Sequence, residues 1–103
     1  MTVRFYFENI KDSDKLALES YFMEKKFVRL QNLLRHGNLE LAKFTANAKY
    51  HSRRSVFIVR LGLVIAQNDL SAEEKGRTPL EALDLAFDRI IGQLRKVESK
   101  KHK

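Results

Sequence analysis

The spacing of apolar residues switches three times along this 103-residue chain between a period of two and a period of three to four. A period of two is typical of a strand with one buried face, and a period near 3.6 is typical of an amphipathic helix. Residues 2–8, 39–51, 56–65 and 70–75 have the strand period, and residues 14–35 and 79–98 have the helix period. The sequence therefore predicts an α+β fold of order β-α-β-β-β-α, in which two helices pack on one face of a four-stranded, mostly antiparallel sheet.

Both predicted helices have recognisable end signals. Thr78-Pro79-Leu80-Glu81 is a capping box, in which a hydroxyl and a carboxylate bind free N–H groups of the first helical turn. Asp12-Ser13-Asp14 offers capping oxygens to the first helix, and Gly37 suits the position after its end. The residues expected to face the core are Leu16, Ser20, Met23, Phe27, Leu30 and Leu34 in the first helix, and Leu80, Leu83, Phe87, Ile90, Leu94 and Val97 in the second.

Length and composition limit the class of protein. A hydrophobic content of 44% supports one folded domain, expected over residues 1–98, with a basic flexible tail over residues 99–103. The absence of cysteine excludes disulfide frameworks and thiolate metal sites. No apolar run reaches the roughly 18 residues of a membrane span, and the first residues do not resemble a signal peptide. We expect a soluble, cytoplasmic domain without a membrane partner.

Residues with catalytic potential are few and scattered. His36, His51 and His102 do not have the spacing of metal ligands. The paired carboxylates each have a structural explanation, such as complementing a helix N-terminus, and the four glycines form no phosphate-binding loop. We therefore expect no enzyme activity, no metal or other cofactor and no small-molecule substrate.

The positive charge is concentrated in two segments. The chain has 20 Lys and Arg against 13 Asp and Glu, a formal charge of +7, and residues 25–60 hold nine of the basic side chains with one acidic one. Residues 89–103 hold six basic side chains and one acidic one. On the predicted helices the spacing gathers Lys25, Lys26 and Arg29 on one side of the first helix, and Arg89, Lys96 and Lys100, with Arg95 close by, on the second. If the helices lie side by side, these cations form one ridge that binds phosphates without reading bases.

Two stretches of the chain carry a family resemblance. The first is Asn9-Ile10-Lys11-Asp12-Ser13-Asp14 after the first strand, followed by Glu24-Lys25-Lys26-Phe27-Val28-Arg29-Leu30. The second is Leu70-Ser71-Ala72-Glu73-Glu74-Lys75-Gly76-Arg77-Thr78-Pro79, continued by Ala82-Leu83-Asp84-Leu85-Ala86-Phe87-Asp88-Arg89-Ile90 and Gln93-Leu94-Arg95-Lys96. Over nearly the whole chain, the order of elements and these motifs resemble the ribosome hibernation promoting factors. The same family is described as ribosome-associated inhibitors, ribosomal subunit interface proteins or sigma-54 modulation proteins.

The resemblance implies a non-catalytic domain that binds the small ribosomal subunit or the intact ribosome. The resemblance further implies that the domain blocks the channel used by mRNA and tRNA during starvation or stationary phase. Gly92 and Glu98 depart from the family pattern at positions that are often basic, and the chain is similar to the short type of member, expected to be monomeric off the ribosome. The residues expected to contact ribosomal RNA are Lys25, Lys26, Arg29, Arg89, Arg95, Lys96 and Lys100. Reversing Lys26 and Arg29 to glutamate is expected to abolish binding and leave the fold intact.

Two other functions remain open on the sequence alone. A general binder of double-stranded or structured RNA shares the strand-strand-strand-helix order, but its last helix starts with basic residues, and this one starts with Glu81 and Asp84. A protein-interaction module would use the cations for an acidic partner or an anionic membrane. Equal affinities for an RNA duplex and for small subunits would favour the general RNA binder. A partner that is still recovered in a pull-down after nuclease treatment would favour the protein-interaction module.

Overall fold

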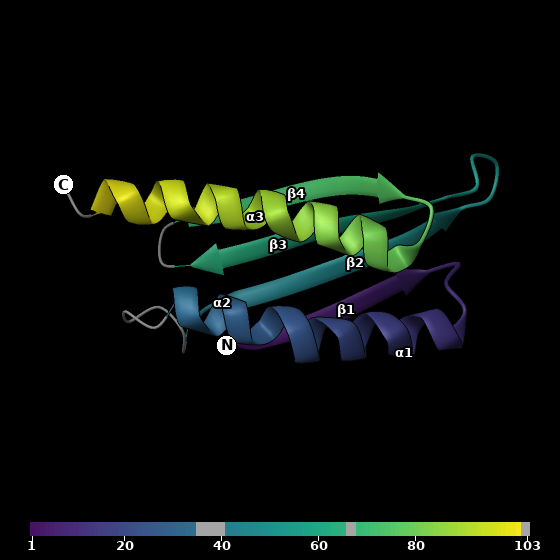
Figure 1. Cartoon of the computed structure of the whole chain (residues 1–103), viewed down its shortest axis with the longest axis horizontal. Coiled ribbons are helices and arrows are strands. Elements are labelled where there is room, and N and C mark those ends of the chain that lie inside the picture. The colour runs from purple at the N-terminus through teal and green to yellow at the C-terminus, as the bar shows by residue number, and fades with distance from the viewer. Residues whose placement is uncertain (35–40, 66–67, 102–103) are drawn as a thin grey trace.

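The computed structural model describes residues 1–34, 41–65 and 68–101, the last four of them as backbone only. Four strands and two helical segments follow one another in the predicted order (Figure 1). The strands are β1 (Thr2–Glu8), β2 (Lys43–His51), β3 (Val56–Ile65) and β4 (Asn68–Gly76). The first helical segment consists of α1 (Asp12–Tyr21), the π-helical turn η1 (Phe22–Lys26) and α2 (Phe27–Leu33), and the second is α3 (Pro79–Lys101).

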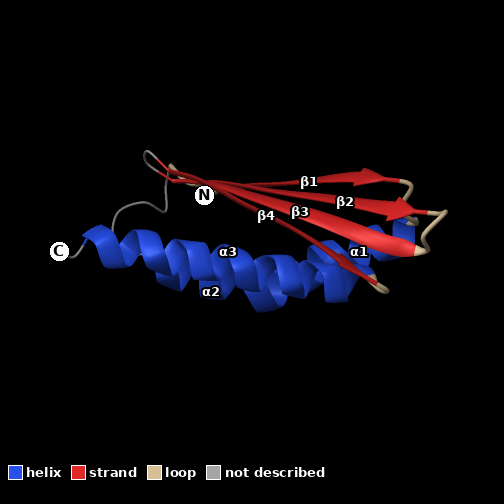
Figure 2. Ribbon diagram, turned by 90° about the horizontal axis from the view of Figure 1, so that it is seen from above, coloured by secondary structure: helices blue, strands red, loops and turns tan. Residues whose placement is uncertain are grey.

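The strands form one sheet of order β1-β2-β3-β4. β1 runs parallel to β2, and the pairs β2–β3 and β3–β4 are antiparallel. The helices of the described residues all lie on one face of this sheet, and none of them lies on the opposite face (Figure 2). The predicted fold class, with a mostly antiparallel sheet, is therefore confirmed.

The first helical segment differs from the prediction in its inward face. Its buried side chains belong to Leu18, Phe22, Leu30 and Leu34. Leu16 and Met23, both expected in the core, are exposed by 65% and 43%, and Ser20 is exposed as well. Phe22 and Leu30 are eight residues apart, about one more than two α-helical turns contain, and the π-helical turn accommodates the extra residue. The inward face predicted for Leu16, Ser20 and Met23 was wrong because a regular helical period was assumed throughout.

The two helical segments begin in different ways. α1 starts at Asp12, with Lys11 as its N-cap and no capping side chain among the described residues. Asp12 and Asp14 lie in the first turn, where the positive end of the helix dipole stabilises a carboxylate. The prediction that their side chains cap the helix was wrong. At α3 the predicted Thr78 cap is present: the Glu81 N–H donates to the Thr78 hydroxyl at 3.1 Å, and the Glu81 carboxylate accepts from the N–H of Arg77, one residue before the N-cap, at 3.3 Å.

The core lies between the helices and the sheet, with Phe22 near its centre. The Phe22 ring stacks on Phe44 at a centroid distance of 4.7 Å and meets Phe5 and Phe87 edge to face. The α3 residues Leu83, Phe87, Ile90 and Leu94 are buried as predicted. Gly37 lies outside the described residues, and α3 includes residues 99–101, which were expected in the tail.

Candidate nucleic-acid interface

The two helical segments meet along a line of ion pairs and one hydrogen bond, here called the interhelical seam. It is formed by Tyr21, Lys26 and Arg29 with Asp84 and Asp88. The Lys26 Nζ lies 2.9 Å from the Asp84 Oδ1, and the Lys26 side chain is 16% exposed. The Tyr21 hydroxyl donates a hydrogen bond of 2.7 Å to the same carboxylate oxygen. The Lys26 ammonium also lies 5.4 Å from the Tyr21 ring centroid and 5.5 Å from that of Phe87. Lys26 therefore joins the helices and is not a free surface cation.

The protonation of the seam follows from these contacts. Burial by itself disfavours the charged form of Lys26, but the hydrogen bond and the charge of Asp84 outweigh this effect, so the pKa of Lys26 lies above its ordinary value. The hydrogen bond that Tyr21 donates to Asp84, together with burial, raises the pKa of the Tyr21 phenol. Lys26 is thus held as a cation and Tyr21 as a neutral donor.

Arg29 and Lys25 are more accessible than Lys26. The Arg29 Nη1 lies 4.0 Å from the Asp88 Oδ1, and both side chains are largely exposed. Lys25 is exposed, and within the described part of the chain it has no ion pair. An exposed pair of this length contributes little to stability, so the Arg29 guanidinium is available to exchange its carboxylate for a phosphate.

Arg89 lies on the other side of α3, against the edge strand β4. Its Nη1 donates to the Glu74 Oε1 at 2.9 Å and to the Glu73 carbonyl oxygen at 3.3 Å. Gln93, one turn further along, donates to the Ser71 carbonyl oxygen at 2.8 Å. These bonds attach α3 to β4. Arg89, one of the cations predicted to contact RNA, therefore already donates hydrogen bonds within the protein.

The last part of α3 supplies two more cations that have no ion-pair partner among the described residues. Arg95 and Lys96 are exposed, and neither has an ion pair among the described residues. Arg95 follows Asp88 by seven residues and so lies on the seam side, whereas Lys96 follows Arg89 by seven and lies on the β4 side. Lys100 belongs to α3, but its side chain is outside the described part.

The cations predicted from helical spacing therefore do not merge into one ridge. Of the side chains that the structure describes, Lys26 and Arg29 lie on the seam side of α3, where they pair with Asp84 and Asp88, and Arg89 lies on its β4 side. The sequence identified the cations correctly as helical residues, but it did not show that Lys26, Arg29 and Arg89 have carboxylate partners.

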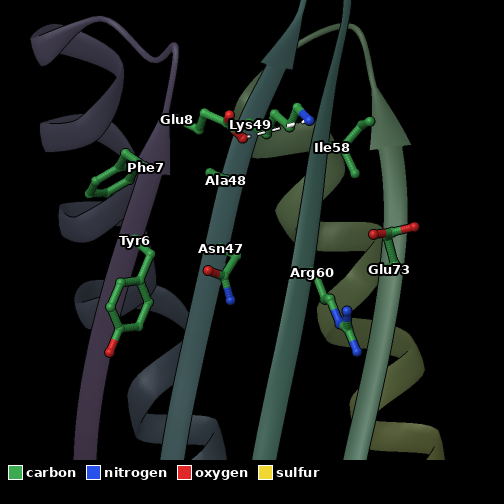
Figure 3. A pocket seen from close by; sticks show the side chains of 9 residues that line it. All are labelled: Tyr6, Phe7, Glu8, Asn47, Ala48, Lys49, Ile58, Arg60 and Glu73. Carbon is green, nitrogen blue, oxygen red and sulfur yellow. Dashed lines mark ion pairs between the residues drawn. The ribbon is translucent and has the colours of Figure 1, made fainter.

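Sequence reasoning also missed a group of side chains on the helix-free face of the sheet. Tyr6, Asn47, Arg60 and Glu73 come from four different strands and line a shallow hollow of about 390 Å³ (Figure 3). Each occupies an outward position in its strand, a signal that the alternation of β1, β2 and β3 contained. Only the strand order and register show that these residues are neighbours.

Metal binding and membrane crossing are two other functions on which the described residues bear. Those residues contain no cluster of three or more His, Cys, Asp or Glu that would hold a metal ion. Among the helices that the structure describes, none has the length and apolar composition needed to cross a membrane.

The sequence matches the family described as Sigma 54 modulation protein / S30EA ribosomal protein over residues 3–102. No curated protein matches it. Among solved structures, the Protein Y N-terminal domain of Thermus thermophilus has a TM-score of 0.75 and 18% identity, with 94% of this chain and 99% of that chain covered. A ribosomal subunit interface protein from Coxiella burnetii has a TM-score of 0.72 and 15% identity, with 96% and 99% covered. At these identities the two structures establish a shared fold.

Proposed function

Because the chain belongs to the family of Sigma 54 modulation and S30EA ribosomal proteins, we propose that it binds the ribosome and keeps it inactive. The partner is the small ribosomal subunit, free or within the intact ribosome, in the cytoplasm. The domain occupies the channel used by mRNA and tRNA during stress or stationary phase, and it acts as a monomer by exclusion, without catalysis. The family match over residues 3–102 is the observation that carries this proposal.

The helical layer supplies the contacts to ribosomal RNA. Lys25, Arg95 and Lys96 are exposed and unpaired among the described residues, so they bind phosphates directly. Lys100 extends this group along α3. Arg29 and Arg89 contribute by replacing an exposed carboxylate with a phosphate, which accepts the same guanidinium donors. Lys26 acts from the seam, where it fixes the spacing of the two helices.

A test of this proposal is sedimentation of the purified protein with small subunits over a range of salt concentrations. If six to ten phosphates are engaged, affinity falls roughly 10³- to 10⁵-fold between 50 and 200 mM salt. Occupation of the channel by mRNA and tRNA should displace the protein. Protein that stays at the top of the gradient in low salt would contradict the proposal.

Variants of equal charge locate the contact surface. The triple variant Lys25→Gln, Arg95→Gln, Lys96→Gln should weaken binding, and the salt slope should decrease by about one for each phosphate contact removed. The matched control neutralises Arg53, Arg54 and Arg77, three exposed cations outside the helices. Equal losses in the two variants would mean that net charge, and not the helical layer, determines binding.

A further inference from the structure

The helix-free face of the sheet carries a row of functional groups in exact register across all four strands. Tyr6 pairs with Asn47, Asn47 with Arg60, and Arg60 with Glu73. The four side chains point to the same side of the sheet, away from the helices (Figure 3). Adjacent strands are about 4.8 Å apart, so Tyr6 and Arg60 are separated by about 10 Å. An aromatic ring, an amide and a guanidinium are thus presented together on a rigid surface.

The neighbouring row on this face combines the cation Arg4 with two hydroxyl side chains on either side of a glycine. Arg4, Thr45, Gly62 and Ser71 are in register. A Cβ atom at Gly62 would lie 2.9 Å from the Thr45 hydroxyl oxygen, so glycine is the residue that fits this position beside Thr45. The surface next to Tyr6 and Arg60 is therefore flat, and two hydroxyl groups border it.

The aromatic ring on this face is unusually accessible. Tyr6 is 49% exposed, although burying a tyrosine ring in the core of so small a domain would be favourable. Its neighbour across the sheet is the polar Asn47, and Ile58, an apolar residue that lines the same hollow, lies two strands away on β3. A single exposed aromatic residue between hydrogen-bonding groups provides a stacking surface for a planar ligand.

The charges on this face favour an anionic ligand over β1, β2 and β3. The cations of those three strands are Arg4, Lys43, Lys49 and Arg60, against Glu8 alone. Lys49 lies 3.6 Å from Glu8, whereas Arg4, Lys43 and Arg60 have no ion pair within the described residues. The acids Asp69 and Glu73 are confined to the edge strand β4, which also carries Lys75. Positive charge therefore predominates over β1, β2 and β3, the strands on and beside which the exposed ring lies.

We propose that this face is a second RNA-binding surface and that its ligand is an unpaired, single-stranded segment of RNA. A base stacks on Tyr6, the Asn47 amide bonds to the base edge, and Arg4 and Arg60 bind the adjoining phosphates. Stacking requires an exposed base, so a regular duplex does not fit. This surface is separate from the helical cations and does not depend on the proposed ribosome binding.

Binding to a labelled ten-nucleotide single strand, followed by fluorescence anisotropy at low salt, tests this inference. Stacking on one aromatic ring predicts that Tyr6→Thr, which keeps a residue suited to a strand, weakens binding roughly 5- to 150-fold. Tyr6→Phe should bind like the wild type, and Arg60→Gln should bind less tightly. Lys75→Gln, a matched loss of charge on the same face at the edge strand, should have little effect.

A second measurement does not rely on loss of function. The chain contains no tryptophan, so Tyr6→Trp introduces a single tryptophan, which can be excited selectively over the tyrosines and whose emission should be quenched when a base stacks on it. Any one of four results would overturn the inference. The wild type does not bind the single strand, Tyr6→Thr binds it with unchanged affinity, the tryptophan emission is not quenched, or a duplex of the same sequence binds equally tightly.

The helical triple variant separates the two proposals. In the Lys25→Gln, Arg95→Gln, Lys96→Gln background, Tyr6→Thr should still weaken binding to the single strand by the same factor. If the wild type binds the single strand in this manner but does not sediment with small subunits, the ribosome proposal fails and the sheet surface stands. The reverse pair of results overturns the sheet surface alone.

Discussion

The substitution Lys26→Glu is expected to destabilise the fold by about 2–4 kcal/mol, because it places a second carboxylate beside Asp84. Lys26 donates to Asp84 at 2.9 Å and is 16% exposed, whereas Asp84 is 41% exposed. A hydrogen bond to a charged group contributes about 1.5–3 kcal/mol, and the exposure of Asp84 reduces this to about 1–2 kcal/mol. Repulsion between the two carboxylates adds about 1–2 kcal/mol after the same reduction. The sequence-based expectation that charge reversal at Lys26 and Arg29 leaves the fold intact does not agree with this contact.

Lys25→Glu is the matched control, since it changes the net charge equally one residue away. Lys25 is exposed, and such substitutions usually change the unfolding free energy by less than about 0.5 kcal/mol. Urea unfolding followed by circular dichroism measures both variants. In thermal unfolding each 1 kcal/mol corresponds to about 4–8 °C in a domain of this size, so Lys26→Glu should lower Tm by about 8 °C or more.

A double-mutant cycle isolates the pair itself. Lys26→Met keeps the aliphatic stem that lies against the rings of Tyr21 and Phe87, and Asp84→Asn keeps an oxygen that accepts from Tyr21. The coupling energy should be about 1–2 kcal/mol, above the range of exposed pairs. A coupling energy near zero, or equal unfolding midpoints for Lys25→Glu and Lys26→Glu, would refute the assignment of Lys26 to the seam.

Two further predictions concern pH and packing. The pKa of Lys26 is raised above its ordinary value of 10.5. Its contribution to the free energy of unfolding is therefore complete at neutral pH and is lost as the pH rises through the folded-state pKa. The unfolding free energies of the wild type and Lys26→Met, measured at a series of alkaline pH values, should converge there. Gly76→Ala should destabilise by about 1–3 kcal/mol, because its Cβ would lie 2.7 Å from the Ala82 backbone nitrogen. The control is Gly92→Ala, because Gly92 lies within α3 and a Cβ atom there would meet no other atom, so this substitution should stabilise the fold by about 0.5–1 kcal/mol. Denaturant midpoints that are both lower, or both higher, than that of the wild type would contradict this packing.

The sequence predicted the fold well where a single periodicity and a local signal agreed. Alternation placed Val3, Phe5 and Phe7 on the inner side of β1, where they pack partly buried against the core. The capping box at Thr78 located the start of α3 to the residue, because its hydrogen bonds join groups within one helical turn. These features need no information about distant parts of the chain.

The prediction failed where the helix changes its winding. Period counting over residues 14–35 assumes a constant 3.6 residues per turn, and η1 breaks this assumption at Phe22. The large aromatic Phe22 contacts four other rings in the core, and burying it favours the rotated register over one that would bury Met23. The tertiary packing of one side chain thus determined which face of α1 turned inward.

The candidate sites show the same limit for charged residues. Helical spacing brought Lys26 and Arg29 together correctly, and it also brought Asp84 and Asp88 together, but no local rule indicates that these two pairs face each other across a helix interface. The distinction matters for function, because a cation that is already paired with a carboxylate, as Lys26 is with Asp84, must give up that partner before it binds a phosphate, and a free cation need not. On the helix-free face, tertiary structure reveals a candidate site where the sequence indicated none. Tyr6, Asn47 and Arg60 have no distinctive pattern within their own strands, and only the register of β1, β2 and β3 makes them adjacent. The local pattern of the sequence thus records which charges and rings are present, and the tertiary pairing decides which of them a ligand can reach.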